Sequence, residues 1–590
     1  MKHQVLKDIF GHNAFRELQE EAIDAVLNQE DLLMILPTGG GKSLVYQLPT
    51  MMMDGVTVVI SPLIALMQDQ VASLQAQNIP AAMLNSMQSF AQTHEVIEQL
   101  LNNQLKFLYI APERLNNQNT LELLQQIPIN FFVIDEAHCI SQWGHEFRSD
   151  YRLLGMLKHH FPTKSIAAFT ATATHHVTSD IIQQLNLQNP RIIKGKIYRQ
   201  NIFIATQRRI GNAQTQLKNF LNLHKNESGI IYVSSRKKAE SLSSYLNQHG
   251  FTTLPYHAGL PPHTREHNFK LFVNDKVQIM VATIAFGMGI DKADIRFVVH
   301  LSLPKSLENY YQEIGRAGRD GERSEALLLF NAGDLAQHKH HLSEITDETY
   351  KKHLQAKITQ IYRYATSEIC FHKQIAEYFE DSLEPCGSHC QNCLSEFEQK
   401  EITKEMQMLL SAIYKTNQIF GKNYIIDVLR GSQDQKLLQN GADKLSVYGI
   451  GKELSKKEWF VIVERSLELG FVTIGEFQSL KLTQEATKVL RSKLQVTIRS
   501  QRLSELEKQK ARVVQEEITY DKDLFEKLRA KRRELADELG VPAYLIFSDK
   551  TLKNLAAAMP SNKEEMLEVS GVGMKKYEQY GEEFLEILNL

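Results

Sequence analysis

Short runs of apolar residues alternate with amphipathic stretches through the first third of the chain. Five of these runs are expected to form buried strands, at residues 32–36, 57–60, 107–110, 131–134 and 166–169. Stretches with a helical pattern separate them. Because strands that are buried on both faces read as continuous apolar runs, this rhythm predicts a parallel sheet covered by helices on both sides.

A second series of apolar runs follows, at residues 229–233, 252–256, 277–281, 297–300 and 326–330. It predicts a second α/β unit, joined to the first near residues 195–201. Beyond residue 334 the pattern becomes helical as far as residue 385, and residues 401–500 mix helices with short strands. Residues 501–517 are charged and poor in apolar residues, which indicates a linker or a solvated helix, and residues 518–590 have a compact helical pattern.

Composition excludes several classes of protein. The 590 residues include 67 Lys and Arg against 69 Asp and Glu, a formal charge of −2, so this is no globally basic DNA-coating protein and any nucleic-acid contact must use local basic surfaces. No run of about 18 apolar residues occurs, so no membrane span is expected. Five cysteines are too few for a disulfide framework, which indicates a reducing, cytoplasmic compartment.

A glycine-rich segment lies between the first predicted strand and a predicted helix. Residues 37–43 read Pro-Thr-Gly-Gly-Gly-Lys-Ser, and a strand before them and a helix after them are the context of a phosphate-binding loop. Backbone N–H groups of such a loop approach phosphate oxygens, Lys42 would neutralise the β and γ phosphates of ATP, and Ser43 would bind Mg²⁺. The general pattern has glycine where this chain has Leu36. The expected ATP contacts in this segment are Thr38, Gly39, Gly40, Gly41, Lys42 and Ser43.

An acidic pair, Asp135 and Glu136, follows the fourth predicted strand within the sequence Asp-Glu-Ala-His. An acid at the carboxyl end of a buried strand can hold Mg²⁺ or its water ligands, and the next acid can orient and deprotonate the attacking water. An acidic pair alone is usually a solvated loop, but together with the upstream loop it indicates nucleotide hydrolysis.

With these residues the chain resembles superfamily 2 helicases of the DEAH-box type, and specifically the RecQ family of DNA helicases. Residues 10–19 resemble the adenine-recognition motif of that family, which implies that Arg16 and Gln19 contact the base. Residues 61–70 resemble the first DNA-contact motif of the family, residues 111–114 the next motif, and residues 170–173 the segment that couples hydrolysis to DNA. Further segments in the order of the family are residues 232–236, 256–259, 282–291 and 312–321. The resemblance implies an α/β fold with two RecA-like parallel-sheet lobes (1–200 and 201–335), a helical zinc-binding subdomain (336–400), a winged helix (401–510) and a small all-α HRDC domain (518–590).

Two arginines, Arg316 and Arg319, belong to the last of those segments. They are three residues apart, so on a helix they would share one face. Aimed at a γ-phosphate, such arginines stabilise the charge of the transition state. We expect Arg319 to be the arginine finger, Arg316 to be a coupling residue or a second phosphate contact, and Gln312 to contact the nucleotide; two solvated surface arginines are the alternative.

Residues 141–148 follow directly after the acidic pair and resemble the aromatic-rich loop of RecQ proteins. Trp143 and Phe147 offer flat faces on which bases can stack, and Arg148 offers charge. We expect Trp143, His145, Phe147 and Arg148 to contact DNA. The alternative is that the two aromatic residues are anchors of the core.

Four of the five cysteines lie within 24 positions: Cys370, Cys386, Cys390 and Cys393. Four thiolates are enough for a closed, tetrahedral, structural Zn²⁺ site. RecQ relatives usually have two residues in the middle gap, a spacing that His389 would satisfy here. The third ligand is therefore Cys390 or His389, and we favour four thiolates.

The resemblance implies an ATP-dependent helicase that moves 3′ to 5′ on single-stranded DNA and unwinds duplex or forked DNA in recombination and repair. The winged helix of related bacterial proteins receives the tail of the single-stranded-DNA-binding protein, so that protein is an expected partner. Basic residues at 527–533 and the turn at 571–576 would tune the choice of DNA; a solvated helix face is the alternative for the basic residues. A non-catalytic DNA-binding scaffold and an RNA helicase of the same fold remain the competing functions.

Overall fold

The computed structural model of the chain describes residues 1–85, 87–141, 148–287, 292–343, 345, 347–394, 399–475, 479–499, 520–569 and 571–589. It consists of two units. The larger unit contains Met1–Ala365, Ile369–Gln391 and Gln515–Leu590, and the smaller unit contains Thr366–Glu368 and Asn392–Val514.

The first lobe of the larger unit is built on a parallel sheet that has seven strands within the described residues, in the order β3-β4-β2-β5-β6-β1-β7. The strands are β1 Leu32–Ile35, β2 Val56–Ile60, β3 Ala81–Leu84, β4 Phe107–Ile110, β5 Ile129–Ile134, β6 Ile166–Thr170 and β7 Arg191–Lys194. Alternate residues of the buried strands enter different cores. In β1, Leu33 and Ile35 join one hydrophobic cluster, while Leu32 and Met34 join the other.

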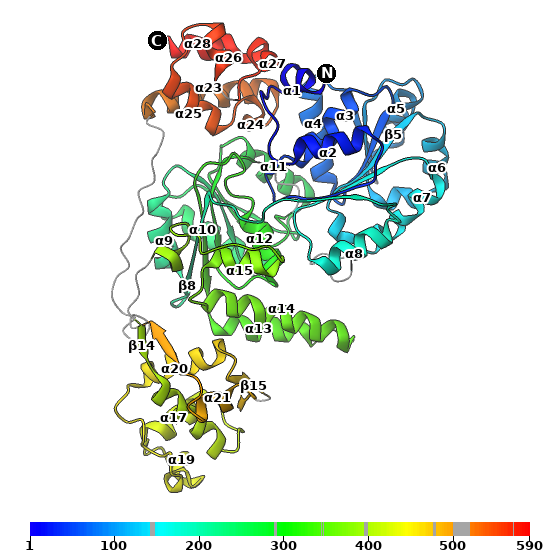
Figure 1. Cartoon of the computed structure of the whole chain (residues 1–590). Helices are drawn as coiled ribbons and strands as arrows, with labels where there is room; N and C mark the ends of the chain where they lie inside the picture. Colours follow the sequence, from blue (N-terminus) through cyan, green and yellow to red (C-terminus); the bar gives the residue numbers. More distant parts are fainter. Residues whose placement is uncertain are drawn as a thin grey trace. The chain divides into compact units, whose positions relative to one another are not determined.

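Helices cover both faces of this sheet, as the apolar runs predict (Figure 1). One cluster includes residues of α1 Lys2–Asp8, α2 Gln19–Leu27, α3 Lys42–Met51 and α4 Ile64–Ala76. The opposite cluster includes residues of α5 Phe90–Leu101, α6 Gln118–Gln125, α7 Met156–His160 and α8 His175–Gln184. The sheet is therefore the middle layer of three, and its strand ends are left to form a site.

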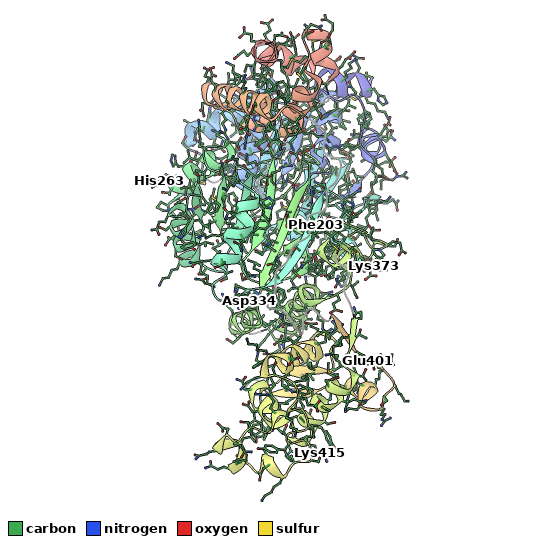
Figure 2. The ribbon with its side chains drawn as sticks, turned by 90° about the vertical axis from the view of Figure 1, so that its left-hand side faces the viewer. Phe203, His263, Asp334, Lys373, Glu401 and Lys415 are labelled. Atoms are coloured by element: carbon green, nitrogen blue, oxygen red, sulfur yellow. The ribbon has the colours of Figure 1, made fainter. Side chains whose placement is uncertain are left out.

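The second lobe repeats this architecture with six described parallel strands, in the order β10-β11-β9-β12-β13-β8. They are β8 Ile202–Arg208, β9 Ser228–Tyr232, β10 Thr253–Tyr256, β11 Ile279–Ala282, β12 Ile295–His300 and β13 Ser324–Phe330. The helices are α9 Gln214–Leu223, α10 Arg236–Asn247, α11 Pro262–Val273 and α12 Leu307–Ile314. In Figure 2 this sheet, marked by Phe203, is seen among its helices, and Asp334 marks the start of the helical segment that follows.

In the two lobes all ten predicted strands are present, with ends within two residues of the prediction, and residues 195–201 lie between β7 and β8. Three further strands of the lobes were not predicted. β3 is Ala-Ala-Met-Leu, which carries no β-branched residue, and β7 has three exposed residues of four, so neither reads as a buried strand. β8 ends in Thr-Gln-Arg and is only partly buried there.

Helices α13 Ala332–Leu342, α14 Glu348–Thr366 and α15 Phe371–Tyr378 follow the second lobe. The 19-residue α14 and its neighbours confirm the helical pattern that the sequence predicts beyond residue 334. The last part of the larger unit is helical as well, with α23 Lys522–Leu539, α24 Ala543–Ile546, α25 Asp549–Ala558, α26 Lys563–Glu568, α27 Met574–Lys576 and α28 Glu582–Leu588.

The smaller unit has the elements of a winged helix. Its helices are α17 Thr403–Lys415, α18 Lys422–Arg430, α19 Gln435–Gln439, α20 Lys456–Glu468 and α21 Ala486–Leu490, and its short antiparallel pairs join β14 Gln399–Glu401 to β17 Thr497–Arg499 and β15 Val472–Ile474 to β16 Leu480–Leu482. Trp459 on α20 is fully buried and donates its indole N–H to the carbonyl of Gly451 at 2.8 Å. The predicted linker at 501–517 lies outside the described residues.

Charged side chains tie the C-terminal helical domain to the second lobe. Arg532 on α23 is completely buried and contacts Asp275 at 3.0 Å and Asp294 at 3.7 Å, while Lys292 contacts the same two carboxylates at 2.6 and 2.8 Å. Arg529 is buried too. For these two arginines the alternative of a solvated helix face is therefore wrong, because α23 packs here against buried carboxylates of the second lobe.

Candidate nucleotide and metal sites

The predicted phosphate-binding loop lies between β1 and α3, and two of its glycines have left-handed backbone conformations. Gly39 has φ of +81° and Gly41 has φ of +78°. A Cβ atom on Gly41 would lie 2.4 Å from Nε2 of Gln19, and one on Gly39 would lie 3.2 Å from Cα of Arg319. Glycine is required at both positions for two reasons. A side chain would strain the left-handed backbone, and its Cβ atom would lie too close to a neighbouring segment.

Two side chains predicted to read the adenine also hold this loop. Arg16 donates to the carbonyl of Gly39 at 2.6 Å, and Gln19 donates to the carbonyl of Gly41 at 3.0 Å. The amide oxygen of Gln19 accepts the N–H of Arg16 at 2.8 Å, so the two residues support each other. The structure thus brings the predicted base-recognition segment and the predicted phosphate loop together.

The acidic pair follows β5 directly. Asp135 donates its backbone N–H to Ile60 of β2 at 2.9 Å, and its carboxylate accepts the N–H of Glu136 at 3.0 Å. Burial and the neighbouring Glu136 raise the pKa of Asp135 to about 7, while the cation of Lys42 opposes this rise. A buried carboxylate that is poorly compensated by its protein neighbours is suited to bind a divalent cation.

Glu136 itself has φ of +48°, a left-handed conformation that costs a non-glycine residue about 1–3 kcal/mol. Its carboxylate lies 3.2 Å from Nδ1 of His138, whose ring also contacts the hydroxyl of Thr170 at 2.9 Å. Thr170 begins the segment 170–173 that the resemblance assigns to coupling. One buried histidine, His138, therefore connects Glu136 of the acidic pair with Thr170 of that segment.

The two arginines of residues 312–321 do not lie on a helix, so the prediction of a shared helix face is wrong. Helix α12 ends at Ile314, and the chain continues in turns in which Gly318 has φ of +59°. Arg319 is brought against Gly39 of the phosphate loop, as described above. Arg316 is buried, and its charge, like that of Arg319, opposes the rise in the pKa of Tyr232 that burial causes.

A pocket of about 260 Å³ opens between the phosphate loop and this turn. It is lined by Arg16, Pro37, Thr38, Gly39, Gly40, Arg199, Asn201, Gly318, Arg319, Asp320, Gly321 and Lys550. Five of these residues are predicted nucleotide contacts or the predicted finger. Gln312 is buried on α12 and does not line the pocket. Sequence reasoning missed Arg199, Asn201 and Lys550, because no motif marks them.

Four cysteine sulfurs gather into one group. The Sγ atoms of Cys370, Cys386, Cys390 and Cys393 all lie within 4.8 Å of one another. Tetrahedral zinc with Zn–S bonds of about 2.3 Å has sulfurs about 3.8 Å apart, so the donor set fits Zn²⁺. His389 is not part of this group; its backbone carbonyl accepts a hydrogen bond from His372 at 3.1 Å. The arrangement supports Cys390 as the third ligand.

Of the predicted DNA contacts, Trp143, His145 and Phe147 lie outside the described residues. Arg148 is described, and it donates to the carbonyl of Pro62 at 2.8 Å and, through its backbone N–H, to the carbonyl of Cys139 at 2.9 Å. It therefore ties the end of the aromatic-rich segment to residues 61–70, another predicted DNA-contact segment.

Comparison with known proteins matches consecutive parts of the chain to five domain descriptions. They are a DEAD/DEAH box helicase (residues 16–181), a helicase conserved C-terminal domain (212–321), RecQ zinc-binding (332–394), an RQC domain (396–507) and an HRDC domain (521–588). The chain is 41% identical over 588 residues to the ATP-dependent DNA helicase RecQ of Haemophilus influenzae, covering 99% of this chain and 95% of that protein.

This chain belongs to the RecQ family. The proteins named ATP-dependent DNA helicase RecQ from Pasteurella multocida and Bacillus subtilis are 42% and 39% identical to it, and the alignments cover 99% of this chain and 93% and 97% of those proteins. The chain is accordingly an ATPase and a DNA helicase. No helix in the described ranges combines the length and the apolarity needed to cross a membrane.

Proposed function

We propose that this RecQ-family helicase moves 3′ to 5′ along single-stranded DNA and unwinds duplex or forked DNA during recombination and repair in the cytoplasm. The observation that carries the proposal is the contact between the two lobes, where Arg319 of the second lobe lies against Gly39 of the first. A triphosphate bound at this loop faces groups from both lobes, so its binding and hydrolysis change how the lobes hold one another.

The proposed roles follow from the geometry of the pocket. Arg16 and Gln19 bind the adenine while supporting the loop, and the loop at residues 38–43 binds the phosphates. Arg319 stabilises the charge that develops on the γ-phosphate, a contribution of roughly 10³–10⁵ in rate for an arginine finger. Arg316 and Gln312 couple the second lobe to this event rather than bind the phosphate, because both are buried away from the pocket lining.

The hydroxyl of Ser43 and the carboxylate of Asp135 are the proposed ligands of Mg²⁺, which when bound neutralises phosphate charge and orients the β and γ phosphates. Glu136 accepts the proton of the attacking water. The contact from Glu136 through His138 to Thr170 supports a path by which this step reaches the segments proposed to hold DNA. Trp143, His145, Phe147 and Arg148 are the proposed contacts of that strand.

The proposed Zn²⁺ site uses Cys370, Cys386, Cys390 and Cys393 and is structural, because four thiolates leave no open coordination position. The domain limits that we propose are residues 1–200 and 201–335 for the lobes, 336–400, 401–510 and 518–590. Single-stranded and forked DNA are the proposed substrates. The single-stranded-DNA-binding protein is the proposed partner of the winged helix.

The test is the unwinding of tailed duplexes that differ in only one feature. A duplex with a 3′ single-stranded tail, one with a 5′ tail, and the RNA versions of both are each incubated with ATP and Mg²⁺. We expect displacement of the strand from the 3′-tailed DNA alone, and ATP turnover that rises when single-stranded DNA is added. Faster unwinding of 5′-tailed DNA would refute the polarity, and equal unwinding of RNA would refute the choice of substrate.

A further inference from the structure

Arg199 lies in the linker between the lobes and grips main-chain atoms of both. Its Nη1 donates to the carbonyl of Thr38 in the phosphate loop at 2.5 Å. Its Nη2 donates to the carbonyls of Ala317 and Gly318 at 3.1 and 2.8 Å, and its Nε donates to the side chain of Asn201 at 3.2 Å. One guanidinium therefore connects the phosphate loop with the turn that carries Arg319.

The linker backbone on either side of Arg199 is fixed. The hydroxyl of Tyr311 on α12 donates to the carbonyl of Ile197 at 2.7 Å, and the carboxylate of Asp381 accepts the N–H of Ile197 at 3.2 Å. Beyond Arg199, the ring of His372 donates to the carbonyl of Ile202 at 3.0 Å. Helix α12 and the zinc-binding subdomain thus hold the linker at both ends.

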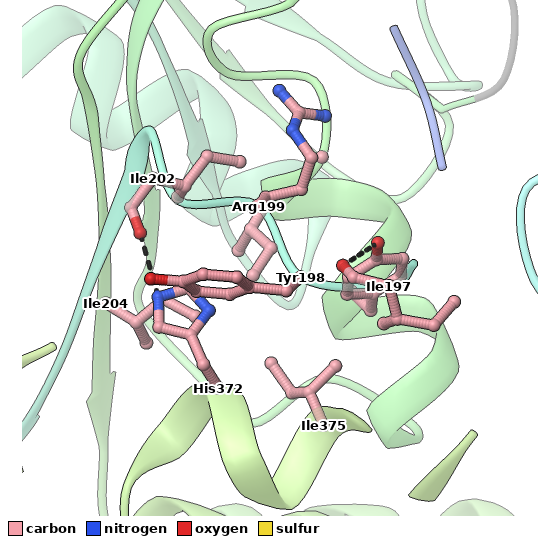
Figure 3. A pocket seen from close by; sticks show the side chains of 10 residues that line it. Ile197, Tyr198, Arg199, Ile202, Ile204, His372 and Ile375 are labelled. Carbon is pink, nitrogen blue, oxygen red and sulfur yellow. Dashed lines mark hydrogen bonds between the residues drawn. The ribbon is translucent and has the colours of Figure 1, made fainter. Parts of the chain in front are cut away.

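Neighbouring side chains of the linker point in opposite directions. Tyr198 packs edge-to-face on His372, with ring centroids 5.0 Å apart. Figure 3 shows the guanidinium of Arg199 pointing away from His372 and Ile375. The cavity between these residues is only about 10 Å³ and is lined mainly by apolar side chains, so it is a packing void and not a ligand site. The packing of Tyr198 against His372 therefore leaves Arg199 directed toward the nucleotide pocket, which it lines.

We propose that Arg199 is a positioning residue for ATP hydrolysis, which holds the phosphate loop and the Arg319 turn at the separation that the reaction needs. Arginine is suited to this role because its planar fork offers several donors in a fixed geometry, which the single ammonium of lysine cannot reproduce. Its partners are neutral carbonyls and one amide oxygen, so within the described residues no carboxylate hydrogen-bonds Arg199 and neutralises its charge beside the pocket.

Fixing the carbonyl of Thr38 also fixes the next backbone N–H. In a trans peptide the N–H points opposite to the preceding C=O, so the Gly39 N–H is directed away from Arg199. Arg199 therefore acts on both sides of the reaction, on the loop that binds phosphate and on the turn that carries the proposed finger. This inference rests on the proposed role of Arg319.

The experiment compares Arg199→Gln, Arg199→Lys and Arg199→Ala in the full zinc-containing chain. Steady-state turnover gives kcat and KM for ATP with and without single-stranded DNA, and a fluorescent ADP analogue gives the affinity for nucleotide. We expect kcat of the glutamine variant to fall roughly 10- to 100-fold, as loss of charge-assisted hydrogen bonds predicts, while ADP affinity changes less than about threefold. The lysine variant recovers only part of the loss.

Added guanidinium ion distinguishes positioning from a general structural effect. It should raise kcat of Arg199→Ala, because it can occupy the vacated site, and should not raise kcat of the wild-type chain. The matched control is Arg191→Ala on β7, which removes an exposed arginine paired with Glu21 and should keep kcat unchanged.

Two results would overturn the inference. One is a glutamine variant with normal kcat, and the other is equal loss of ADP affinity and kcat without rescue by guanidinium, which is the signature of a tether alone. Arg319→Gln is measured in parallel. If it loses turnover while Arg199→Gln does not, the positioning role fails and the proposed function stands; if neither loses turnover, the proposed finger fails as well.

Discussion

Replacing Asp135 by asparagine should stabilise the first lobe in the absence of Mg²⁺ and nucleotide, although Asp135 is a proposed ligand of Mg²⁺. The pKa of Asp135 is raised from 3.8 to about 7 by burial and by Glu136. A carboxyl group with a raised folded-state pKa binds more protons in the folded than in the unfolded state between pH 4 and pH 7. Stability therefore falls as pH rises through this window, and the full penalty is present above it.

The size of the effect follows from the pKa difference. A rise in pKa from 3.8 to about 7, at 1.36 kcal/mol per pH unit, gives a penalty on the order of 4 kcal/mol at pH 8, of which less than half, roughly 2 kcal/mol, is already present at pH 5. Asparagine carries no charge and avoids the penalty. Its side-chain oxygen can still accept the N–H of Glu136, and the backbone carbonyl still accepts the hydroxyl of Tyr151 at 2.9 Å.

Hydrogen exchange of β5 amides is the appropriate assay, because it reports the opening of this sheet rather than of the whole chain. Both proteins are compared at the same pH, so the intrinsic exchange rates cancel. We expect protection in Asp135→Asn to exceed the wild type on the order of 10³-fold at pH 8 and only roughly 20-fold at pH 5. The exposed Asp54, replaced by asparagine in the same lobe, is the control.

A ratio of variant to wild-type protection that stays constant from pH 5 to pH 8, or a variant less protected than the wild type at pH 8, would refute the reasoning.

The raised pKa of Asp135 also predicts a pH dependence of Mg²⁺ binding. Because Mg²⁺ binds the carboxylate and not the acid, its affinity for the wild-type chain with nucleotide should fall about tenfold per pH unit below pH 7.

Further changes probe the other parts of the site. Glu136→Gln should keep ATP affinity and reduce turnover about 10²- to 10⁴-fold, as equilibrium binding and single-turnover hydrolysis would measure; normal turnover would exclude it as the base. Cys390→Ser should lose zinc by metal analysis while His389→Ala keeps it, and the opposite result would make His389 the ligand. Trp143→Ala should keep basal ATP turnover but lose its stimulation by DNA; unchanged stimulation would mean a core role. Arg532→Met leaves buried carboxylates with one cation fewer, at a cost of about 3–5 kcal/mol, so the C-terminal domain should become protease-sensitive; unchanged cleavage would contradict the docking.

The sequence predicts best those features that depend on local pattern. Continuous apolar runs identify buried parallel strands, and the ends of such strands place Lys42 and Asp135 at one edge of the sheet. The four cysteines are recognisable because zinc sites have characteristic spacings. The hydrophobic pattern does not identify β7, because three of its four residues are exposed. The three-residue spacing of Arg316 and Arg319 suggests a shared helix, but α12 ends at Ile314, before both of them.

Residues that act through long-range contacts leave no local signal at all. Arg199 stands in an irregular linker, 161 positions from Thr38, and Arg532 stands 257 positions from Asp275. Nothing in the composition of either segment indicates its partner. These contacts depend on the packing of whole lobes, which is decided by the summed apolar surface of many residues rather than by the segment itself.

The phosphate loop shows why such contacts matter for chemistry. Its carbonyls at Thr38, Gly39 and Gly41 are held by Arg199, Arg16 and Gln19, three side chains from outside the loop. Since each trans peptide directs the next N–H opposite to its carbonyl, these bonds orient the N–H groups of Gly39, Gly40 and Lys42, of which that of Gly40 donates to the carbonyl of Pro37 at 2.9 Å. Donors that are already oriented need no reorganisation when charge develops on a phosphate, which is how preorganised sites stabilise a transition state. The motif therefore supplies the glycines, while distant parts of the fold supply the side chains whose hydrogen bonds hold the backbone conformation of the loop.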